Sequence, residues 1–349
     1  MTRLPASRVP DPMDAPPVRW GILGAGSIAG AFTYAVRHGT RGSVTVVGSR
    51  DQGRADAFAA EHGVGRGVGS YAELVAADDV DIVYVASPHS EHHEHALLAL
   101  TAGKPVLVEK SFTRNAPEAR EVVQTARERG LLCIEAMWSR FLPHYDIVRQ
   151  IVANGQLGTI RSVAADHGQP LWPDGPRRLS DPELAGGALL DLGIYPVSFA
   201  HLVLGSLTGL RAQGTLTPEG VDLTTSVLAT NSAGAHAVLS TTMGAKTPTT
   251  ALIAGDKGRV EIAGEFYQPN SVVLRGPNGE EIDRWDPPAN EPHGFRYEAA
   301  EAARCLHEGR TETDYLPLDD TIAIMTVMDE IRAQIGVRYP GEAPLPATA

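Results

Sequence analysis

Cysteine is nearly absent from this sequence: Cys133 and Cys305 are the only two among 349 residues. Neither lies in a CxxC pair or beside histidines at a spacing typical of metal ligands. A disulfide framework is therefore not expected. Unpaired cysteines are typical of a reducing compartment, so we expect a cytoplasmic protein.

Positive charge is also in short supply. The sequence contains 30 Lys and Arg against 42 Asp and Glu, which gives a formal net charge of −12. Binding a nucleic-acid backbone requires clustered basic side chains, so no nucleic-acid partner is expected. A small cationic pocket for a single phosphate is still compatible with this balance.

Long hydrophobic runs are lacking too. We find no apolar run long enough to cross a bilayer, and no apolar segment of a secretory signal follows Arg3 and Arg8, so no membrane partner is expected. Residues 1–17 contain five prolines, which predicts a disordered arm. Residues 341–349 are rich in Pro and Ala, and we interpret them as a loose tail.

Between residues 18 and 139, apolar runs alternate with helical spacings. Residues 44–47 and 81–86 are typical of buried strands, and residues 94–102 and 116–129 of helices. This alternation predicts βαβ units and an α/β fold, in which an N-terminal Rossmann domain contains a doubly wound parallel sheet.

After residue 139 the pattern changes, and we assign residues 140–340 to a second domain. Alternating segments between 210 and 285, separated by turn signals, predict an α+β domain with a large, mostly antiparallel open sheet. Two helices, near 296–306 and 319–335, are expected to complete it.

The first strand of the Rossmann domain ends in a glycine-rich turn. Gly24, Gly26 and Ala29 form a GxGxxA pattern between a strand and a helix. Small residues allow a tight turn, and they let backbone N–H groups, such as those of Ser27 and Ile28, approach a pyrophosphate. The pattern predicts a dinucleotide site, with a tight turn that binds no ligand as the alternative.

The end of the second strand distinguishes between two dinucleotides. NAD-binding domains place an acidic residue there to accept from the ribose 2′-OH. Here Ser49 is followed by Arg50, and Arg54 comes one helical turn later. Two guanidinium groups and a hydroxyl suit a 2′-phosphate, so we expect NADP. NAD stays open as the alternative if Asp51 reaches the ribose.

Three side chains are candidates for catalysis, namely Lys110, Asp191 and Tyr195. Lys110 follows a strand at the edge where α/β sheets bind ligands, although an exposed lysine is the simpler interpretation. Asp191 and Tyr195 are spaced i, i+4 in an otherwise apolar helix and therefore share one face. They form either a functional pair or a local structural network.

The loop between 168 and 182 is bordered by His167 and contains Arg178, and both are candidate substrate contacts. A structural histidine and a solvated arginine are the alternatives. A second group of histidines occupies residues 89–95, but it lacks the HExxH order, and its members cannot share one helix face. We interpret that group as a helix start beside the cofactor and predict no metal site.

Three motifs in order carry a resemblance to a known family. Gly24-x-Gly26, Val108-Glu109-Lys110 and residues 186–196 (GGALLDLGIYP) resemble the glucose-fructose oxidoreductase / inositol dehydrogenase / MocA family. Residues 135–143 (EAMWSRFLP) resemble the branch that contains dimeric dihydrodiol dehydrogenases and NADP-dependent D-xylose dehydrogenases. The resemblance implies hydride transfer between nicotinamide C4 and a secondary alcohol or ketone of a sugar, polyol or vicinal diol.

The resemblance also implies roles for single residues. Lys110 would be the essential lysine, Tyr195 the proton donor or acceptor, and Asp191 a residue that orients the substrate. Arg50 and Arg54 would contact the 2′-phosphate. Other implied contacts are Pro88, His89, His92, Glu109 and Lys110 on the cofactor side, and Trp138, Arg140 and Phe141 around the nicotinamide and substrate.

One residue departs from the family pattern. The family usually has Glu-Lys-Pro, and here Ser111 replaces the proline. Without the fixed φ of proline, the turn that aims Lys110 is expected to be looser. By analogy with the family, we also expect a homodimer or higher homo-oligomer that forms through the second-domain sheet.

Two other functions are weighed against this one. The first is a non-catalytic NADP-binding sensor, and the second is a cofactor-retaining enzyme that passes hydride between two sugars. A sensor would need neither Lys110 nor Tyr195, so the presence of both favours a catalyst.

Overall fold

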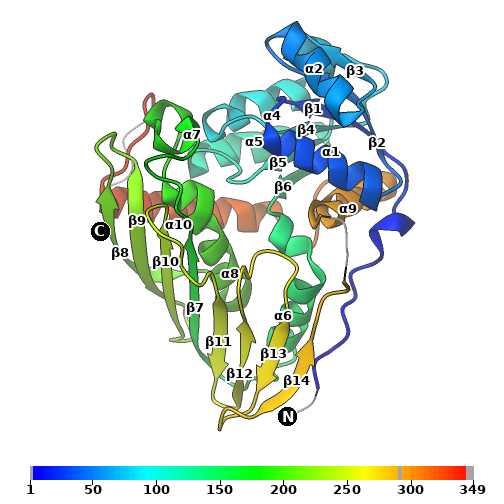
Figure 1. Ribbon diagram of the computed structural model, residues 1–349. Helices are drawn as coiled ribbons and strands as arrows, with labels where there is room; N and C mark the ends of the chain where they lie inside the picture. The colour runs from blue at the N-terminus through cyan, green and yellow to red at the C-terminus, as the bar shows by residue number, and fades with distance from the viewer. Residues whose placement is uncertain (1–2, 290–292, 343–349) are drawn as a thin grey trace. The chain divides into compact units, whose positions relative to one another are not determined.

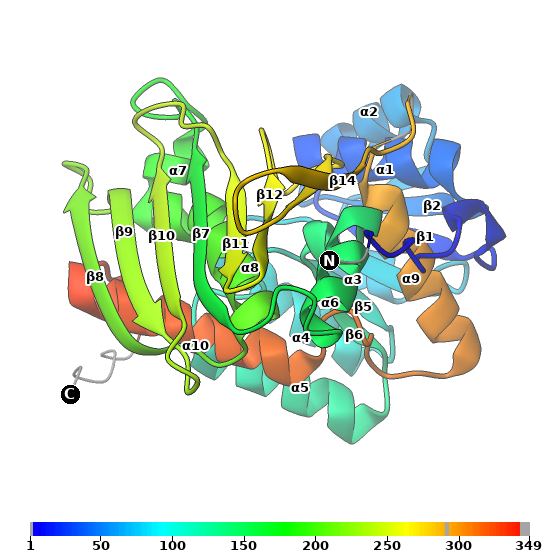
Figure 2. The ribbon, with the colours of Figure 1, turned by 90° about the horizontal axis from the view of Figure 1, so that it is seen from below.

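The computed structural model describes residues 3–289 and 293–342, and these separate into two compact units. The first, which we call the Rossmann unit, contains residues 10–141 and the described part of 290–322. The second, the large-sheet unit, contains the described residues of 1–9, 142–289 and 323–349. Figures 1 and 2 show the elements of each unit.

The Rossmann unit is built on a six-stranded parallel sheet in the order β3-β2-β1-β4-β5-β6. This order is that of a doubly wound dinucleotide-binding sheet, so the predicted α/β fold is confirmed. Every residue of β4, β5 and β6 is buried, as expected for parallel strands that are covered on both faces. The strands are β1 (Arg19–Leu23), β2 (Ser43–Gly48), β3 (Arg66–Val68), β4 (Ile82–Val85), β5 (Val106–Glu109) and β6 (Cys133–Ala136).

Helices cover this sheet, and polar caps fix where several of them begin. Asp51, Ser70 and Asn115 each accept the backbone N–H three residues ahead, which satisfies a donor of the first helical turn. The helices are α1 (Ser27–Gly39), α2 (Gln52–His62), α3 (Tyr71–Val75), α4 (His92–Thr101), α5 (Ala116–Arg129) and α9 (Phe295–Glu308), with short 3₁₀ turns η1 (Pro12–Asp14), η2 (His89–Glu91) and η3 (Trp138–Phe141).

Helix α9 corrects the predicted division of the chain. The sequence places its residues in the second domain, but α9 belongs to the Rossmann unit. A Cβ on Gly39 of α1 would lie 2.8 Å from Arg296 of α9, so the two helices pack closely (Figure 1). The absence of a side chain at Gly39 makes this contact possible, and local helical periodicity does not reveal it.

The large-sheet unit contains eight strands in the order β14-β13-β12-β11-β7-β10-β9-β8. Among the described strands of this sheet, β7 and β10 are the one parallel pair, so the predicted, mostly antiparallel sheet is confirmed. The strands are β7 (Ile160–Gly168), β8 (Thr208–Leu216), β9 (Asp222–Thr230), β10 (His236–Thr242), β11 (Ala251–Gly255), β12 (Gly258–Ile262), β13 (Val272–Arg275) and β14 (Glu281–Trp285).

Helices cover one face of this sheet. Helix α8 packs against β7 and β10, and the end of α10 packs against β8, where Ala212 N donates to the Gln334 side chain at 2.8 Å (Figure 2). On the other face, Leu228 and Val238 pair across β9 and β10 and are 56% and 49% exposed. The helical elements are α6 (Pro143–Ala153), α7 (Arg177–Ser180), η4 (Pro182–Leu184), the π-helical turn η5 (Leu189–Gly193), α8 (Ile194–Leu204) and, from residue 323 on, α10 (Leu318–Ile335).

The N-terminal segment differs from the expected disordered arm. Leu4 N donates to Asp283 at 2.9 Å, Arg8 N donates to Asp146 at 2.7 Å, and Ala15 is buried. The prolines restrict φ, which lowers the entropy that the segment loses when it becomes ordered. Of the expected tail, residues 343–349 lie outside the described residues.

One stretch is long and apolar enough to cross a bilayer, although no such run was expected from the sequence. By length and composition alone, Pro182–Leu204 could cross a membrane. However, 94% of its apolar window is buried inside the protein, as in the core helix of a soluble protein.

Candidate active site

The glycine turn at the end of β1 is shaped by two glycines with different constraints. Gly24 has φ +109°, and a Cβ there would lie 2.8 Å from the carbonyl oxygen of Ala86. Gly26 precedes α1 in an extended conformation without a side-chain cap, and a Cβ there would meet no atom of residues 3–289 and 293–342 within 4 Å. The first N–H groups of a helix have no acceptor within the helix, so those of Ser27 and Ile28 are available to an anion at this uncrowded turn.

The end of β2 favours the 2′-phosphate hypothesis. Asp51 caps α2 by accepting Arg54 N at 2.7 Å, so its carboxylate is already engaged by the start of its own helix. The Arg54 guanidinium donates to the Ala25 carbonyl in the glycine turn at 3.1 Å. Arg50 is exposed beside the buried Ser49. The exposed arginines suit a phosphate group better than Asp51 suits a ribose hydroxyl.

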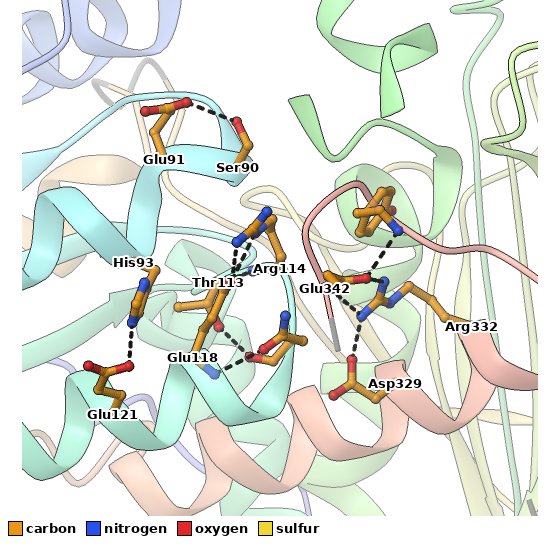
Figure 3. A network of polar contacts seen from close by, with 12 residues as sticks. Ser90, Glu91, His93, Thr113, Arg114, Glu118, Glu121, Asp329, Arg332 and Glu342 are labelled. Carbon is orange, nitrogen blue, oxygen red and sulfur yellow. Dashed lines mark hydrogen bonds and ion pairs between the residues drawn. The ribbon is translucent and has the colours of Figure 1, made fainter. Parts of the chain in front are cut away.

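The histidine-rich segment after β4 makes separate contacts. Pro88 opens η2, and His89 and His92 are buried with ring centroids 5.6 Å apart. His93 is paired with Glu121 at 2.9 Å on the surface (Figure 3). Within 3–289 and 293–342, no three His, Cys, Asp or Glu residues are grouped to hold a metal ion.

His92 links two loops of the Rossmann unit. Its Nδ1 lies 2.8 Å from the Ser111 carbonyl oxygen, and its Nε2 lies 2.8 Å from the Ser87 carbonyl oxygen. Burial is the largest cause that lowers the pKa of His92, to about 4, so the ring is neutral near pH 7. A neutral imidazole carries one N–H, so His92 lies between the two loops but donates to only one of the two carbonyl oxygens.

The turn that carries Lys110 is held from several sides. Lys110 N donates to Glu109 Oε2 at 3.1 Å, and Phe112 N donates to Glu135 Oε1 at 3.3 Å. Ser111 is fully buried, and the Lys110–Ser111 peptide bond is cis. Hydrogen bonds and buried side chains thus surround the turn at Ser111, where the fixed φ of proline is missing.

The acidic residues that hold this turn are buried. Tyr84 Oη donates to Glu109 Oε1, and Thr321 Oγ1 donates to Glu135 Oε2 at 2.9 Å. Burial raises the pKa of Glu135 to about 7. Sequence reasoning missed Tyr84 and Glu135, although an acidic residue within a buried strand is a signal that could have identified Glu135.

Trp138, Arg140 and Phe141 lie in η3, and all three are buried. The Trp138 ring stacks on His293 at 5.2 Å between centroids, and Phe141 makes an edge contact with Tyr315 at 5.8 Å. Trp138 and Phe141 thus pack against aromatic side chains of the Rossmann unit.

In the large-sheet unit, Asp191 and Tyr195 have different partners. Asp191 lies in the π-helical turn η5, and its Oδ1 pairs with Arg178 Nη1 at 2.9 Å. Tyr195 lies in the first turn of α8, with its ring centroid 5.3 Å from that of His167. The predicted regular i, i+4 face is thus replaced by a π-turn followed by an α-helix.

An aromatic group surrounds Tyr195. The Tyr267 ring stacks on His167 with centroids 4.4 Å apart and lies 4.6 Å from the Tyr195 ring. Gln169 Nε2 contacts His167 Nε2 at 2.9 Å and Tyr267 Oη at 3.3 Å. Burial is the main cause that raises the pKa of Tyr267. Sequence reasoning missed Tyr267 and Gln169, because both lie in loops without a motif.

A buried polar network supports the π-turn. Asp222 Oδ2 accepts Leu189 N, the first residue of η5, at 2.7 Å. Burial raises the pKa of Asp222 to about 6. Tyr339 Oη donates to the Gly186 carbonyl at 2.7 Å, and Arg332 pairs with Asp329 at 2.7 Å and Glu342 at 2.8 Å (Figure 3). The end of the described chain thus braces the segment that carries Asp191.

Comparison with known protein families matches both units. A profile described as an oxidoreductase family with an NAD-binding Rossmann fold matches residues 18–137, and one for the GFO/IDH/MocA C-terminal domain matches residues 145–261. The chain belongs to the GFO/IDH/MocA oxidoreductase family. The resemblance inferred from the motifs is therefore confirmed.

Members of this family are similar along most of the chain. Trans-1,2-dihydrobenzene-1,2-diol dehydrogenase of Bos taurus is 36% identical over 332 residues, which cover 93% of this chain and 98% of that protein. The Homo sapiens protein of the same name is 34% identical, with 93% and 98% covered. These relatives support the dihydrodiol dehydrogenase branch.

Solved structures of the family agree with the fold. A 3-ketoreductase from Actinomadura kijaniata, in complex with NADP and TDP-benzene, superposes with a TM-score of 0.80 and 29% identity, covering 92% of this chain and 98% of that one. An aldose-aldose oxidoreductase from Caulobacter crescentus has a TM-score of 0.80, 23% identity and coverage of 91% and 97%, and supports the fold alone.

Proposed function

We propose that this GFO/IDH/MocA oxidoreductase uses NADP to interconvert a secondary alcohol and a ketone in a vicinal diol or sugar. The cofactor assignment rests on two contacts. Asp51 caps α2 by accepting Arg54 N, and the Arg54 guanidinium donates to the Ala25 carbonyl in the glycine turn. The relatives named dihydrodiol dehydrogenase and the NADP complex of the 3-ketoreductase support both halves of the proposal.

Residues of the Rossmann unit are assigned to hold the cofactor. The N–H groups that follow Gly24 and Gly26, at Ser27 and Ile28, bind the pyrophosphate, and Arg50 and Arg54 bind the 2′-phosphate with Ser49 beside them. The loop with Pro88, His89 and His92 and the pair Glu109-Lys110 border the nicotinamide side. The bound cofactor supplies or accepts the hydride at nicotinamide C4.

Residues of the large-sheet unit are assigned to the substrate. Tyr195 moves the proton of the reacting hydroxyl, as acceptor in oxidation and donor in reduction, assisted by Lys110. An ammonium group near a phenol favours the phenolate, which makes the phenol a better base. The Asp191–Arg178 ion pair and His167 offer donors and acceptors to neighbouring hydroxyls of a diol or sugar.

A spectrophotometric assay with NADPH or NADP⁺ tests this function across vicinal diols, aldoses, ketoses and dicarbonyls. We expect turnover of at least one class by the wild type, and a loss of kcat of about a hundredfold or more in Lys110→Met and Tyr195→Phe. Full activity of Tyr195→Phe contradicts the proton-transfer assignment. Tight NADP binding without any turnover favours the sensor.

The cofactor preference has its own experiment. NADP⁺ and NAD⁺ are titrated against the wild type, Arg50→Ala and Arg54→Ala, with the exposed Arg41→Ala as the matched control. Loss of one bidentate phosphate contact is expected to raise the Kd of NADP⁺ at least tenfold and to leave the Kd of NAD⁺ unchanged. Equal loss for both dinucleotides contradicts the 2′-phosphate assignment.

We also propose that the protein is a cytoplasmic homodimer or higher homo-oligomer that associates through the uncovered face of the large sheet. The exposed pair Leu228 and Val238 lies on this face. Light scattering coupled to size exclusion measures the mass, and Leu228→Lys is expected to shift it toward the monomer. A monomeric wild type contradicts the proposal.

A further inference from the structure

Tyr339 follows α10 near the end of the described chain, and its hydroxyl reaches back to the segment that carries Asp191. Tyr339 Oη donates to the Gly186 carbonyl oxygen at 2.7 Å, although the two residues are 153 positions apart in the sequence. The tyrosine is buried. Burial raises the pKa of Tyr339, so the phenol stays protonated and donates at neutral pH. The proposed reaction does not use this hydroxyl.

Charged side chains hold Tyr339 in place. The Arg332 guanidinium lies over the Tyr339 ring, 4.7 Å from its centroid. Arg332 is fully buried and pairs with Asp329 at 2.7 Å and with Glu342 at 2.8 Å (Figure 3). Glu342 in turn accepts Tyr339 N at 3.1 Å. Tyr339 is thus held through its ring and its backbone, so its hydroxyl is preorganised for the bond to Gly186.

The carbonyl that Tyr339 holds lies in a tightly folded segment. Gly187 N donates to the Leu179 carbonyl oxygen at 2.8 Å, and a Cβ on Gly186 would lie 2.5 Å from the same oxygen. The side chain of Leu179 is buried with that of Ala188 in one apolar cluster. The turn at residues 186–187 therefore packs directly on the backbone that carries Leu179.

The two members of the Arg178–Asp191 ion pair flank this turn. Arg178 directly precedes Leu179, and Asp191 follows Gly186 in the π-helical turn η5. The Arg178 side chain is 45% exposed and that of Asp191 10%, so water competes for the guanidinium. The geometry of the pair therefore depends on the backbone between its members, which the Tyr339 bond holds.

We propose that Tyr339 is a positioning residue that fixes the Gly186 turn and so aims the Arg178–Asp191 ion pair at the substrate. Tyr339 Oη holds the carbonyl of this turn, and a carboxylate of β9 holds the first N–H of η5. Without the hydroxyl, the Gly186 carbonyl loses a buried partner, and the segment between the two charged residues opens more easily. The inference rests on the proposed function in one point, the contact of the ion pair with substrate hydroxyls.

The first test measures local order and needs no substrate. Amide hydrogen exchange, followed by mass spectrometry, compares peptides from residues 178–191 in the wild type and in Tyr339→Phe, which keeps the ring beside Arg332. We expect exchange in these peptides to be about fivefold faster or more in the variant, because the loss of a buried hydrogen bond favours local opening. Peptides from α1 should exchange as in the wild type. Equal exchange of residues 178–191 in the two proteins overturns the proposal.

The matched control removes the same hydroxyl from the surface. Tyr34 is exposed on α1, so Tyr34→Phe should leave both the exchange of residues 178–191 and the KM of the substrate unchanged. If Tyr34→Phe changes both as much as Tyr339→Phe does, the effect is not specific to the Gly186 bond and the proposal is wrong.

The second test measures kinetics with the substrate found in the NADPH assay. Loss of binding that is equal in the ground and transition states raises KM alone, so Tyr339→Phe is expected to raise KM about fivefold or more. Its kcat should stay within about threefold, and its Kd for NADP⁺ should be unchanged.

A double variant tests whether Tyr339 acts through the ion pair. Arg178→Ala is expected to raise KM too, and the addition of Tyr339→Phe to Arg178→Ala should raise it no further, since residues that act together are not additive. An unchanged KM in Tyr339→Phe, or effects of the two substitutions that multiply, overturns the positioning role.

The two tests separate the possible failures. If the wild type turns over no substrate, the proposed function fails, yet the exchange of residues 178–191 still decides whether Tyr339 holds the turn. If Tyr339→Phe does not fold, Glu342→Gln decides, because it leaves the phenol in place, keeps an acceptor for Tyr339 N and weakens the pairing with Arg332. Faster exchange of residues 178–191 in Glu342→Gln supports the proposal, and wild-type exchange overturns it.

Discussion

The two glycines of the turn differ in whether a side chain would have room at their positions. Gly24 faces the Ala86 carbonyl and has a positive φ, whereas Gly26 has an ordinary extended backbone and open space in front of it. The first glycine is thus required by the fold itself, and the second by what the fold is proposed to bind.

This difference predicts opposite outcomes for two alanine variants. Gly24→Ala is expected to lose about 1–3 kcal/mol of stability, because the Cβ meets Ala86 and φ is unfavourable. Gly26→Ala is expected to keep the wild-type Tm. It should raise the Kd of NADP⁺ at least tenfold, since its methyl group would occupy the space proposed for the pyrophosphate. Calorimetry and cofactor titration measure the two effects, and a Gly26→Ala protein with unchanged Kd contradicts the pyrophosphate assignment.

His92 makes stability depend on pH at the residue scale. Its pKa is lowered from 6.5 to about 4, so the unfolded state takes up a proton before the folded state does. Its contribution is complete above pH 6.5 and is lost as pH falls toward 4, a change of about 3 kcal/mol. Denaturant unfolding measures the free energy of unfolding of the wild type and His92→Gln at pH 7 and pH 4. The difference between the two proteins should change by this amount between the two pH values.

The surface residue His38 is the control for that experiment. It is exposed at the end of α1, so His38→Gln removes a histidine without opening a buried site. If His92→Gln retains the full acid-induced loss of the wild type, then His92 is not the group responsible.

At the scale of elements, the π-helical turn η5 places Asp191 and the start of α8. A π-turn leaves backbone groups without the regular α-helical partners, so its first N–H needs an acceptor from elsewhere. Asp222 of β9 provides it, and the close approach of Asp222 to Gly187 leaves no room for a Cβ at that glycine.

Removal of Asp222 should therefore affect the helix that bears Tyr195. Asp222→Ala leaves the buried Leu189 N–H without its acceptor and is expected to cost about 1–3 kcal/mol and to lower kcat. Asp222→Asn keeps an acceptor and should recover most of both. Thr225→Val removes only the second bond to Asp222 and should cost less. Chemical unfolding and kcat measure the series, and equal losses in Ala and Asn variants argue against capping.

Element types were predictable from the sequence where local patterns determine them. Apolar runs such as β4 predict buried parallel strands, and the GxGxxA turn fixes the start of α1. The return of α9 to the Rossmann unit, the π-turn of η5 and the bond from Tyr339 to Gly186 were not predictable. Each depends on contacts between residues far apart in the chain, and such contacts leave no periodic signal in a single sequence.

At the scale of the whole molecule, the N-terminal segment shows how distant parts of the chain become ordered together. Within the large-sheet unit, Leu4 N donates to the Asp283 carboxylate of β14, and Gln150 Nε2 of α6 donates to the Ala6 carbonyl at 2.9 Å. Arg8 binds Asp146 through its backbone and its guanidinium, at 2.7 and 3.1 Å. The Asp146 side chain is only 3% exposed, so water cannot easily replace these donors.

Deletion of residues 1–9 is therefore expected to destabilise the protein by about 2 kcal/mol, because Asp146 loses two donors while it stays buried. Arg8→Ala keeps the backbone donor and removes a side chain that is 68% exposed, so its loss should stay below about 1 kcal/mol. Urea unfolding compares both with the wild type. An unchanged midpoint after the deletion would mean that Gln150, which donates to Asp146 at 2.9 Å, suffices to hold this carboxylate.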